Sequence, residues 1–564
     1  MKKLIVLLLA LVMLFSMVAC SNNYVDGGPT TNKLSETDAL KELRSCLDRV
    51  GSVGKGNPEV DLTAGTTEAI NELPEINQAY PITVDANKGT VVEFWMATEK
   101  SGEGNDGWGN DVAKRFNAQY TNGSIKIRSI DPGPSVDYIL AGLTPDAWSP
   151  ANALWHSMIE SKGYNISLIE KKLAGNTAGI LMKNSVYNDF IAKYQTVTLE
   201  NVIVAVNNGD FILGFTNPYV SDTALNMLTQ VLISLDPTDP LSNKAATGFL
   251  ELQSKCPPPA LNTTQMRESA AKGFIDVMVM ERQAYINKTE LSDYKFTPFG
   301  IRHDNPVSVF DDNMTPEKRQ VLNDFIEFCK QPEQQRLATQ YGFNNPEDES
   351  YQGMPTFEEG SMFFKAQSLW KKNKAGGRQH VTVIVSDRSG SMGDPAAKGS
   401  TVTKMDLLQM SLINGFSVIG NDVALGMVSY SDSFTIELEI DNFVGEHKAK
   451  AVSAVKAMSP SGGTSSYSAV AIAIDMIMNA KDRYPNAIYS IYLLTDGDVR
   501  NGISLDKIAP IIASLDINVN AIGYGSDVKE AELQKLVSYK EGFVQMVDEN
   551  NVIYGVKTIF NSQF

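Results

Sequence analysis

The chain has 564 residues, more than one hydrophobic core usually organises, and this length indicates several globular units. Hydrophobic residues make up 43% of it and charged residues 20%, which excludes a disordered chain and is typical of a folded protein. The formal charge of -17 excludes a nucleic-acid partner held by a basic surface, because phosphate contacts need clustered Lys and Arg.

The first twenty residues are typical of a bacterial secretion signal. Lys2 and Lys3 precede an apolar run at 4–18, which is shorter than a membrane-spanning helix needs. The run ends in Met-Val-Ala-Cys at 17–20, which resembles a lipobox with Met17 in place of the usual Leu. We therefore expect Cys20 to carry a lipid that anchors the protein to the outer face of the cell membrane. An ordinary cleaved signal peptide and an uncleaved anchor helix are the alternatives.

Residues 21–90 are polar and rich in Gly, Thr and Asn, and we interpret them as a tether and lead-in with one short helix at 37–50. The three cysteines beyond Cys20 are widely spaced, so they predict no disulfide framework, although one bridge stays open. The histidines are scattered too, so we expect no metal site built on histidine. These residues are Cys46, Cys256, Cys329, His156, His303, His380 and His447.

Residues 91–345 alternate strand-like and helix-like patterns, beginning with a strand at 91–97, a helix at 111–120 and a strand at 124–130. Short motifs follow in order at 145–151, 215–221, 303–306, 332–335 and 341–343. This order resembles the bacterial extracellular solute-binding proteins of the periplasmic type. The resemblance implies two α/β lobes that close over a small molecule.

The same resemblance implies ligand contacts from the loops that follow the strands. Hydroxyls and amides at helix N-termini suit an anion or another polar solute, whereas Glu99 fits an anion poorly. The alternative for each position is an ordinary turn or cap residue. The candidate ligand-binding residues are Thr98, Glu99, Trp148, Ser149, Thr216, Asn217 and Ser221.

Residues 346–378 are polar and end in a basic, glycine-containing stretch, and we interpret them as a linker. Residues 379–564 form a second alternating unit, whose short β-branched runs suit parallel strands buried on both faces. Such alternation predicts an α/β fold with a doubly wound parallel sheet. The expected strands are 381–385, 423–430, 490–494, 519–522 and 543–547, and the expected helices are 404–416, 448–458, 468–479 and 529–538.

Oxygen-bearing side chains follow the strands of this unit. Asp387, Ser389 and Ser391 come directly after the first strand, and Asp496 follows the strand at 490–494. Thr464 lies in a glycine-rich loop that precedes a helix. Ligands of doubly wound sheets bind at the carboxyl ends of strands, and oxygen donors with two carboxylates suit a hard cation such as Mg²⁺.

This pattern resembles the von Willebrand factor A family with its metal-ion-dependent adhesion site, in which all five of these positions are metal ligands. The resemblance implies a Rossmann-like fold, a divalent cation (Mg²⁺, or else Mn²⁺ or Ca²⁺), and an open coordination position for an acidic residue of a protein partner. The alternative is a domain of the same fold that has lost its metal.

Two functions follow from these patterns. The first is a membrane-anchored adhesion or assembly module that binds a protein partner through the metal, with the solute-binding-like region for sensing or scaffolding. The second is the substrate-binding lipoprotein of a transport system, with the C-terminal domain as a docking module. We expect that the protein is not an enzyme, since the motifs supply no nucleophile together with a base and a third group that orients the base.

Overall fold

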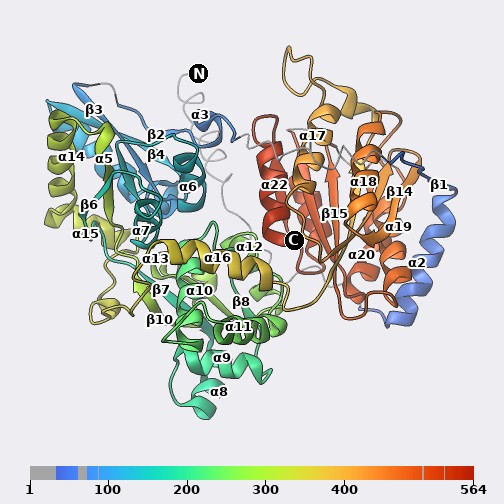
Figure 1. The fold of residues 1–564 in the computed structure, drawn as a ribbon, viewed down its shortest axis with the longest axis horizontal. Helices are drawn as coiled ribbons and strands as arrows, with labels where there is room; N and C mark the ends of the chain where they lie inside the picture. The colour runs from blue at the N-terminus through green and yellow to red at the C-terminus, as the bar shows by residue number, and fades with distance from the viewer. Residues whose placement is uncertain (1–32, 61–72, 87, 498, 500, 526–527) are drawn as a thin grey trace, which may run out of the picture.

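The computed structural model describes residues 33–60, 73–86, 88–497, 499, 501–525 and 528–564. The signal sequence and Cys20 lie outside these residues. The strands of the described residues form sheets of seven, six and four strands, and the seven-stranded sheet lies beside the two others (Figure 1). In the described parts of the chain, no helix has both the length and the apolar character that crossing a membrane requires.

The seven-stranded sheet forms the centre of the C-terminal domain, in the order β1-β14-β13-β12-β15-β16-β17. β12, β13 and β15 are buried along their whole length, which explains their unbroken apolar sequences. The five predicted strands are all present, and two strands are additions: β14, which pairs antiparallel with β13, and β1, which pairs parallel with β14. The strands are β1 (Val53–Lys55), β12 (His380–Asp387), β13 (Val423–Tyr430), β14 (Phe434–Asn442), β15 (Ile488–Thr495), β16 (Asn518–Tyr524) and β17 (Val544–Val547).

Helices cover both faces of this sheet, so the predicted doubly wound architecture is confirmed. One face packs against α17 (Lys404–Phe416), α18 (Gly445–Ala457) and α22 (Val552–Gln563). The other packs against α2 (Glu36–Val50), α19 (Ser466–Ala480), α20 (Leu505–Ser514) and α21 (Glu530–Val537).

Part of the N-terminal segment belongs to this C-terminal domain. α2 buries Ala39, Leu43 and Cys46 in the same apolar cluster as α19 and α20. β1 pairs parallel with β14 at the edge of the sheet. The helix was predicted, but its packing partner lies more than 400 residues away, so no local pattern could reveal it. Residues 34–55 are therefore structural members of the domain rather than a free tether.

The central region has the two lobes that its motifs indicated. The first lobe is a six-stranded sheet in the order β2-β4-β3-β5-β11-β6, with helices on both faces. Its strands are β2 (Ile82–Val84), β3 (Thr90–Met96), β4 (Gly123–Ser129), β5 (Ala147–Ser149), β6 (Ile166–Glu170) and β11 (Val307–Phe310). Its helices are α3 (Ile76–Ala79), α4 (Thr98–Ser101), η2 (Gly104–Asp106), α5 (Trp108–Gln119), α6 (Pro132–Leu140), α7 (Leu154–Glu160), η4 (Asp311–Asn313), α14 (Pro316–Cys329) and α15 (Pro332–Gln340).

The second lobe is a four-stranded sheet in the order β10-β7-β9-β8. The chain crosses between the lobes at 171–176 and at 303–306, and the two crossings are joined by backbone hydrogen bonds. The strands are β7 (Thr177–Lys183), β8 (Leu213–Gly214), β9 (Val277–Glu281) and β10 (Tyr294–Arg302). The helices are α8 (Asn184–Tyr194), α9 (Leu199–Asn207), α10 (Asp222–Leu235), α11 (Asn243–Lys255), α12 (Thr263–Ala271), α13 (Arg282–Ile286) and η3 (Thr289–Leu291).

The segment expected to be a linker is itself folded. It contains η5 (Pro346–Asp348) and α16 (Ser361–Asn373). α16 buries Phe363 and Trp370 in the core of the central region, against α10 and α11. The prediction of a linker was wrong because the polar residues of this segment include lysines that flank the apolar face of an amphipathic helix.

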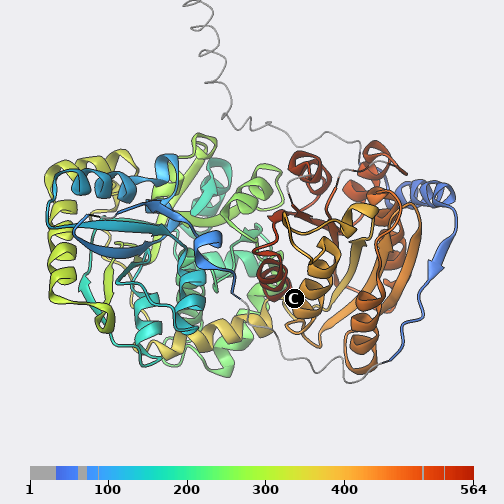
Figure 2. The ribbon, with the colours of Figure 1, turned by 90° about the horizontal axis from the view of Figure 1, so that it is seen from above.

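The last helix of the chain lies between the domain and the two lobes (Figures 1 and 2). The hydroxyl of Tyr554 donates to Asp137 Oδ2 of the first lobe at 2.7 Å. At its other end, Gln563 Nε2 donates to Pro259 O beside the second lobe at 3.2 Å, and Lys374 Nζ donates to the carbonyl of Ser562 at 2.6 Å. α22 therefore contacts both lobes.

Candidate functional site

The carboxyl end of β12 carries the first part of the candidate metal site. Asp387 is the last residue of this buried strand and is 0% exposed. Its Oδ1 accepts a hydrogen bond from the Ser389 backbone at 2.8 Å, and its Oδ2 accepts from the hydroxyls of Tyr430 and Thr495. Burial raises the pKa of Asp387, hydrogen bonds from Ser389 and Thr495 oppose the rise, and the charge of Asp496 adds to it. A cation placed beside this carboxylate would stabilise its charged form.

Three oxygens from two strand ends converge here. Ser389 Oγ lies 3.1 Å from Ser391 Oγ, and Ser391 Oγ lies 2.9 Å from Asp496 Oδ1. Neighbouring oxygens around an octahedral Mg²⁺, each about 2.0–2.1 Å from the ion, are about 2.9 Å apart. The spacing therefore fits both the direct hydrogen bonds and the edge of a coordination shell, so these residues fit a hard divalent cation.

Thr464 comes to the site on the glycine-rich loop before α19. The backbone N–H of Ser461 donates to Arg388 O at 2.7 Å, and that of Gly390 donates to Gly462 O at 2.9 Å. These bonds hold the two loops against each other, and Thr464 is buried. The guanidinium of Arg388 bonds the hydroxyls of Ser461 and Ser433. All five predicted metal ligands thus lie at a strand end or on loops that meet at one edge of the sheet.

Three further residues support the site and were not predicted. Lys404, the first residue of α17, places its ammonium 2.9 Å from Asp496 Oδ2. Tyr430 ends β13 and bonds Asp387, and Asp432 accepts a 2.6 Å hydrogen bond from the Gly463 backbone. Tyr430 could have been predicted as a site residue, because it ends a strand whose carboxyl end lies beside that of β12. Nothing in the sequence indicated that Lys404 would reach Asp496.

A metal here depends on hydroxyl ligands. Across the described ranges, no three His, Cys, Asp or Glu side chains gather closely enough to hold a metal ion by themselves. The three described cysteines, Cys46, Cys256 and Cys329, are buried and unpaired, which answers the question of a bridge. A site of two carboxylates and three hydroxyls is the donor set that suits Mg²⁺.

In the central region, Thr98 and Glu99 lie where the lobes meet. The hydroxyl of Thr98 bonds Asp131 Oδ1, and its backbone N–H donates to the same oxygen at 3.2 Å. Glu99 Oε1 pairs with Lys100 Nζ at 3.0 Å, and the Lys100 side chain is 0% exposed. Burial raises the pKa of Glu99 to about 7, in spite of the attraction of Lys100.

The other candidate ligand-binding residues have local roles. Trp148 packs in the core on β5, and the hydroxyl of its neighbour Ser149 is buried with no hydrogen-bond partner among the described residues. Thr216 is buried beside Ala260, Asn217 Oδ1 accepts from the Tyr219 backbone, and Ser221 caps α10. The cap matters for the site, because it fixes Asp222 as the first residue of α10.

Comparison with known families decides what the two parts are. Residues 382–560 match the family model of the von Willebrand factor type A domain, and residues 105–344 match that of the bacterial extracellular solute-binding proteins. The chain joins a solute-binding domain to a von Willebrand domain. The predicted fold and the order of the two domains are therefore confirmed. No curated protein matches the chain.

Solved structures with related folds are distant. A von Willebrand factor type A protein from Catenulispora acidiphila is 20% identical over 33% of this chain, with a TM-score of 0.28, and the chain spans only 43% of it. Proximal thread matrix protein 1 from the mussel byssus, which has zinc in its adhesion-site motif, is 17% identical over 35% of this chain and 52% of its own, with a TM-score of 0.25. A periplasmic thiamin-binding protein is 10% identical over 52% of this chain and 99% of its own, with a TM-score of 0.37.

Proposed function

We propose that this chain is an extracytoplasmic binding protein whose von Willebrand domain holds a divalent cation and through it a protein partner. The observation that supports this is the convergence of Asp387, Ser389, Ser391 and Asp496, with oxygens 2.9 and 3.1 Å apart at strand ends. Thr464 would complete the ligands from its adjacent loop. When bound, the metal would supply a positive charge with an open position for an acidic side chain of the partner.

Binding rather than catalysis is the better explanation of this site. A serine nucleophile needs a base that a third group orients. Here the hydroxyls of Ser389 and Ser391 bond each other, and Asp496, the carboxylate next to them, is already paired with Lys404. The match to extracellular solute-binding proteins supports a location outside the cytoplasm.

A calorimetric experiment tests the metal site. Because Mg²⁺ would bind only the folded domain, it should stabilise that domain by about 2.7 kcal/mol when free Mg²⁺ is 100 times its dissociation constant. Asp387→Ala should abolish the shift, and Asp394→Ala, an exposed carboxylate on the same loop, should retain it. Equal melting in Mg²⁺ and in EDTA would contradict the proposal. Partner binding should likewise be lost in EDTA and in Asp387→Ala.

Anchoring through Cys20 is a separate part of the proposal. It is supported by the short apolar segment that ends at a lipobox-like cysteine. Expressed with Cys20→Ala, the protein should lose acyl labelling and leave the membrane fraction. Unchanged labelling would show that another segment holds the protein at the membrane.

A second candidate function is that of a solute receptor, with the von Willebrand domain as its docking module. It is favoured by contacts that cross between the lobes: Trp155 Nε1 of the first lobe donates to Asp222 Oδ1 of the second at 2.7 Å, and Gln283 Nε2 of the second donates to Asp106 Oδ1 of the first at 2.9 Å. Lobes that meet around polar side chains are suited to enclosing a small molecule. Permease genes beside the gene for this chain would favour this function.

A further inference from the structure

Carboxylates gather where the two lobes of the solute-binding domain meet. Glu99 and Asp131 come from the first lobe, at α4 and at the start of α6, and Asp222 and Glu281 come from the second, at the start of α10 and the end of β9. Burial is the main cause of the raised pKa of Glu99 and of Asp222, and the charges are close enough to add to it: Glu281 and Asp131 raise the pKa of Glu99, and Glu99 and Glu281 raise that of Asp222. We call these four carboxylates and Lys100 the interlobe cluster.

His303 lies beside the cluster and adds no positive charge to it. Its Nε2 faces the amide nitrogens of Asn152 and Asn226 at 3.2 and 3.0 Å. The orientation of both amides is fixed, because their oxygens accept from the backbone N–H groups of Leu154 and Ile301. Nε2 is therefore an acceptor, and the neutral ring donates from Nδ1 to Glu281 Oε1 at 2.7 Å.

Glu281 accepts hydrogen bonds from two neighbours. Besides His303, the amide of Asn176 donates to its Oε2 at 2.5 Å. Asn176 is fixed in turn, since its own oxygen accepts from the Gln283 backbone at 3.1 Å. The crossings at 171–176 and 303–306 thus each contribute a hydrogen-bond donor to this carboxylate.

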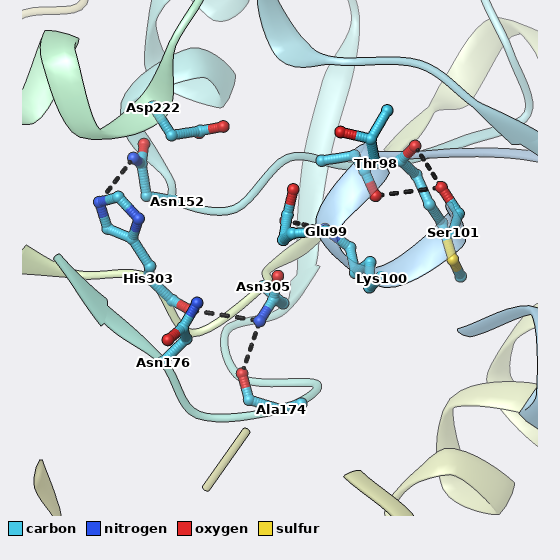
Figure 3. Close-up of polar contacts among 12 residues, drawn as sticks. Thr98, Glu99, Lys100, Ser101, Asn152, Ala174, Asn176, Asp222, His303 and Asn305 are labelled. Carbon is cyan, nitrogen blue, oxygen red and sulfur yellow. Dashed lines mark hydrogen bonds and ion pairs between the residues drawn. The ribbon is translucent and has the colours of Figure 1, made fainter. Parts of the chain in front are cut away.

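The side chains of both lobes point into the same space. Figure 3 shows the carboxylate of Asp222 directed toward Glu99, with the oxygen of Asn305 directed toward Glu99 from below. Asn305 is 0% exposed, and its amide nitrogen donates to Ala174 O and His303 O. Its Oδ1 has no hydrogen-bond partner among the described residues. A buried acceptor without a donor is costly, so this atom indicates a missing hydrogen-bond donor.

The cluster is also short of positive charge. Four carboxylates face one ammonium, that of Lys100, which already pairs with Glu99. Burial raises the pKa of Asp131 and of Asp222, as it does that of Glu99. Buried charges of one sign are unfavourable unless counter-charges compensate them. A bound cation would relieve this repulsion, whereas an anion would increase it.

The nature of the cation follows from the geometry. No three of the described carboxylates gather closely enough to hold a metal ion by themselves. The open oxygen of Asn305 requires an N–H or O–H donor. We propose that the solute-binding domain takes an organic cation with N–H donors, an ammonium, amidinium or guanidinium compound, between Glu99 and Asp222. The inference rests on the receptor function proposed above.

Titration of the full chain with agmatine, which carries an ammonium and a guanidinium, tests this. Choline serves as a cation without N–H donors, and sulfate as an anion. All five tryptophans lie between residues 95 and 370, so tryptophan emission reports melting of the solute-binding region and not of the von Willebrand domain. Agmatine should raise this melting temperature, and choline and sulfate should not.

Matched variants locate the site. Glu99→Gln and Asp222→Asn each replace a carboxyl group that a bound cation would hold in its ionised form, and each should weaken agmatine binding about 30-fold or more, as expected for loss of one partner in a buried charge pair. Glu103→Gln removes the same charge from an exposed residue four positions after Glu99 and should bind as the wild type does.

Each result separates the inference from the function on which it rests. A shift with sulfate alone would overturn the cation and leave a receptor for anions. A response to choline equal to that of agmatine would overturn the role of Asn305 and the N–H donors. Binding of agmatine that Glu99→Gln and Asp222→Asn leave unchanged would place it elsewhere and overturn the site. No response to any probe would overturn both the inference and the receptor function, while the Mg²⁺ test of the von Willebrand domain would be unaffected.

Discussion

The residues of the candidate metal site come from one domain, whereas those of the interlobe cluster come from two separate lobes. The metal site lies at one edge of a single sheet, where backbone hydrogen bonds join its loops. The interlobe cluster is divided between two sheets that the chain links at 171–176 and 303–306. The metal site should therefore persist as long as its own domain folds, whereas the cluster should exist in full only when the lobes approach.

The two sites also differ in how they treat charge. At the metal site, two carboxylates share hydrogen bonds from hydroxyls and one lysine, Lys404. In the interlobe cluster, four carboxylates share one lysine and a histidine that is neutral. The first site can be stable when empty, and the second gains more from a bound cation. The four predictions below test these differences, beginning with the largest expected effect.

Leu43→Ala should destabilise the von Willebrand domain by about 2–5 kcal/mol, because truncating a buried leucine leaves a cavity. Leu43 is 2% exposed in the core that α2 shares with α19 and α20. Calorimetry should show the loss, while tryptophan emission, which reports only the central region, should be unchanged. Lys41→Ala, exposed on the same helix, is the control. An unchanged transition would mean that α2 does not belong to this domain.

The same helix shows what could be predicted from the sequence. Local periodicity predicted α2 and the strands of the doubly wound sheet, since side-chain patterns repeat over a few residues. Four of the five proposed metal ligands could be predicted because each follows a strand that the sequence also predicts, and Thr464 because it lies in a glycine-rich loop before a predicted helix. The packing of α2 and the reach of Lys404 depend on distant residues.

Only some residues of the interlobe cluster could be predicted from the sequence. Thr98 and Glu99 were candidates because they follow a strand. Asp222 was not predicted, because the motif pointed to Ser221, the residue before it. Glu281 and Asp131 sit at strand ends too, but no motif distinguishes them from other acidic residues. A charge cluster assembled from both lobes appears only when the lobes are placed together.

Gly133→Ala should weaken agmatine binding by hindering lobe closure. A Cβ at Gly133 on α6 would lie 2.4 Å from Tyr219 O of the second lobe, so the lobes would have to move apart. Overpacking of this kind costs about 1–3 kcal/mol, which corresponds to about 5-fold to 150-fold in affinity. The Mg²⁺ response should be unchanged.

Leu140→Ala, exposed on the same helix, is the control for this substitution and should bind agmatine normally. Small-angle scattering should show a more extended Gly133→Ala protein. Normal agmatine affinity in Gly133→Ala would mean that the solute site does not need the closed lobes, and the contrast with the metal site would disappear.

Agmatine binding should weaken as the pH falls below about 7. Burial raises the pKa of Glu99 to about 7, so below that pH its neutral form prevails and the attraction for a cation is lost. Glu99 faces Lys100 on its own helix, and Asp131, Asp222, Glu281 and the neutral His303 on neighbouring segments. Agmatine stays charged, so affinity should fall about tenfold per pH unit below the pKa.

Titrations from pH 5.5 to pH 8 would measure this dependence. Glu99→Gln should bind weakly at every pH and show a shallower slope, because its amide does not titrate while Asp222, whose pKa burial also raises, still does. A wild-type affinity that rises as the pH falls would contradict the assignment of Glu99 as the group that holds the cation.

Lys404→Met should strengthen Mg²⁺ binding about fivefold or more, the smallest of the four effects. The ammonium lies 2.9 Å from Asp496 Oδ2 and is mostly buried, so it stabilises the carboxylates when the metal is absent and would repel the metal when it is present. In EDTA, Lys404→Met should therefore melt at a lower temperature than the wild-type von Willebrand domain. In saturating Mg²⁺, the gap between the melting temperatures of the variant and the wild type should be smaller. Lys398→Met, an exposed lysine on the preceding loop, should change neither value. If Lys404→Met instead weakens Mg²⁺ binding, the lysine serves to position Asp496 as a ligand, and the metal site, like the interlobe cluster, depends on a buried lysine to hold its carboxylates in place.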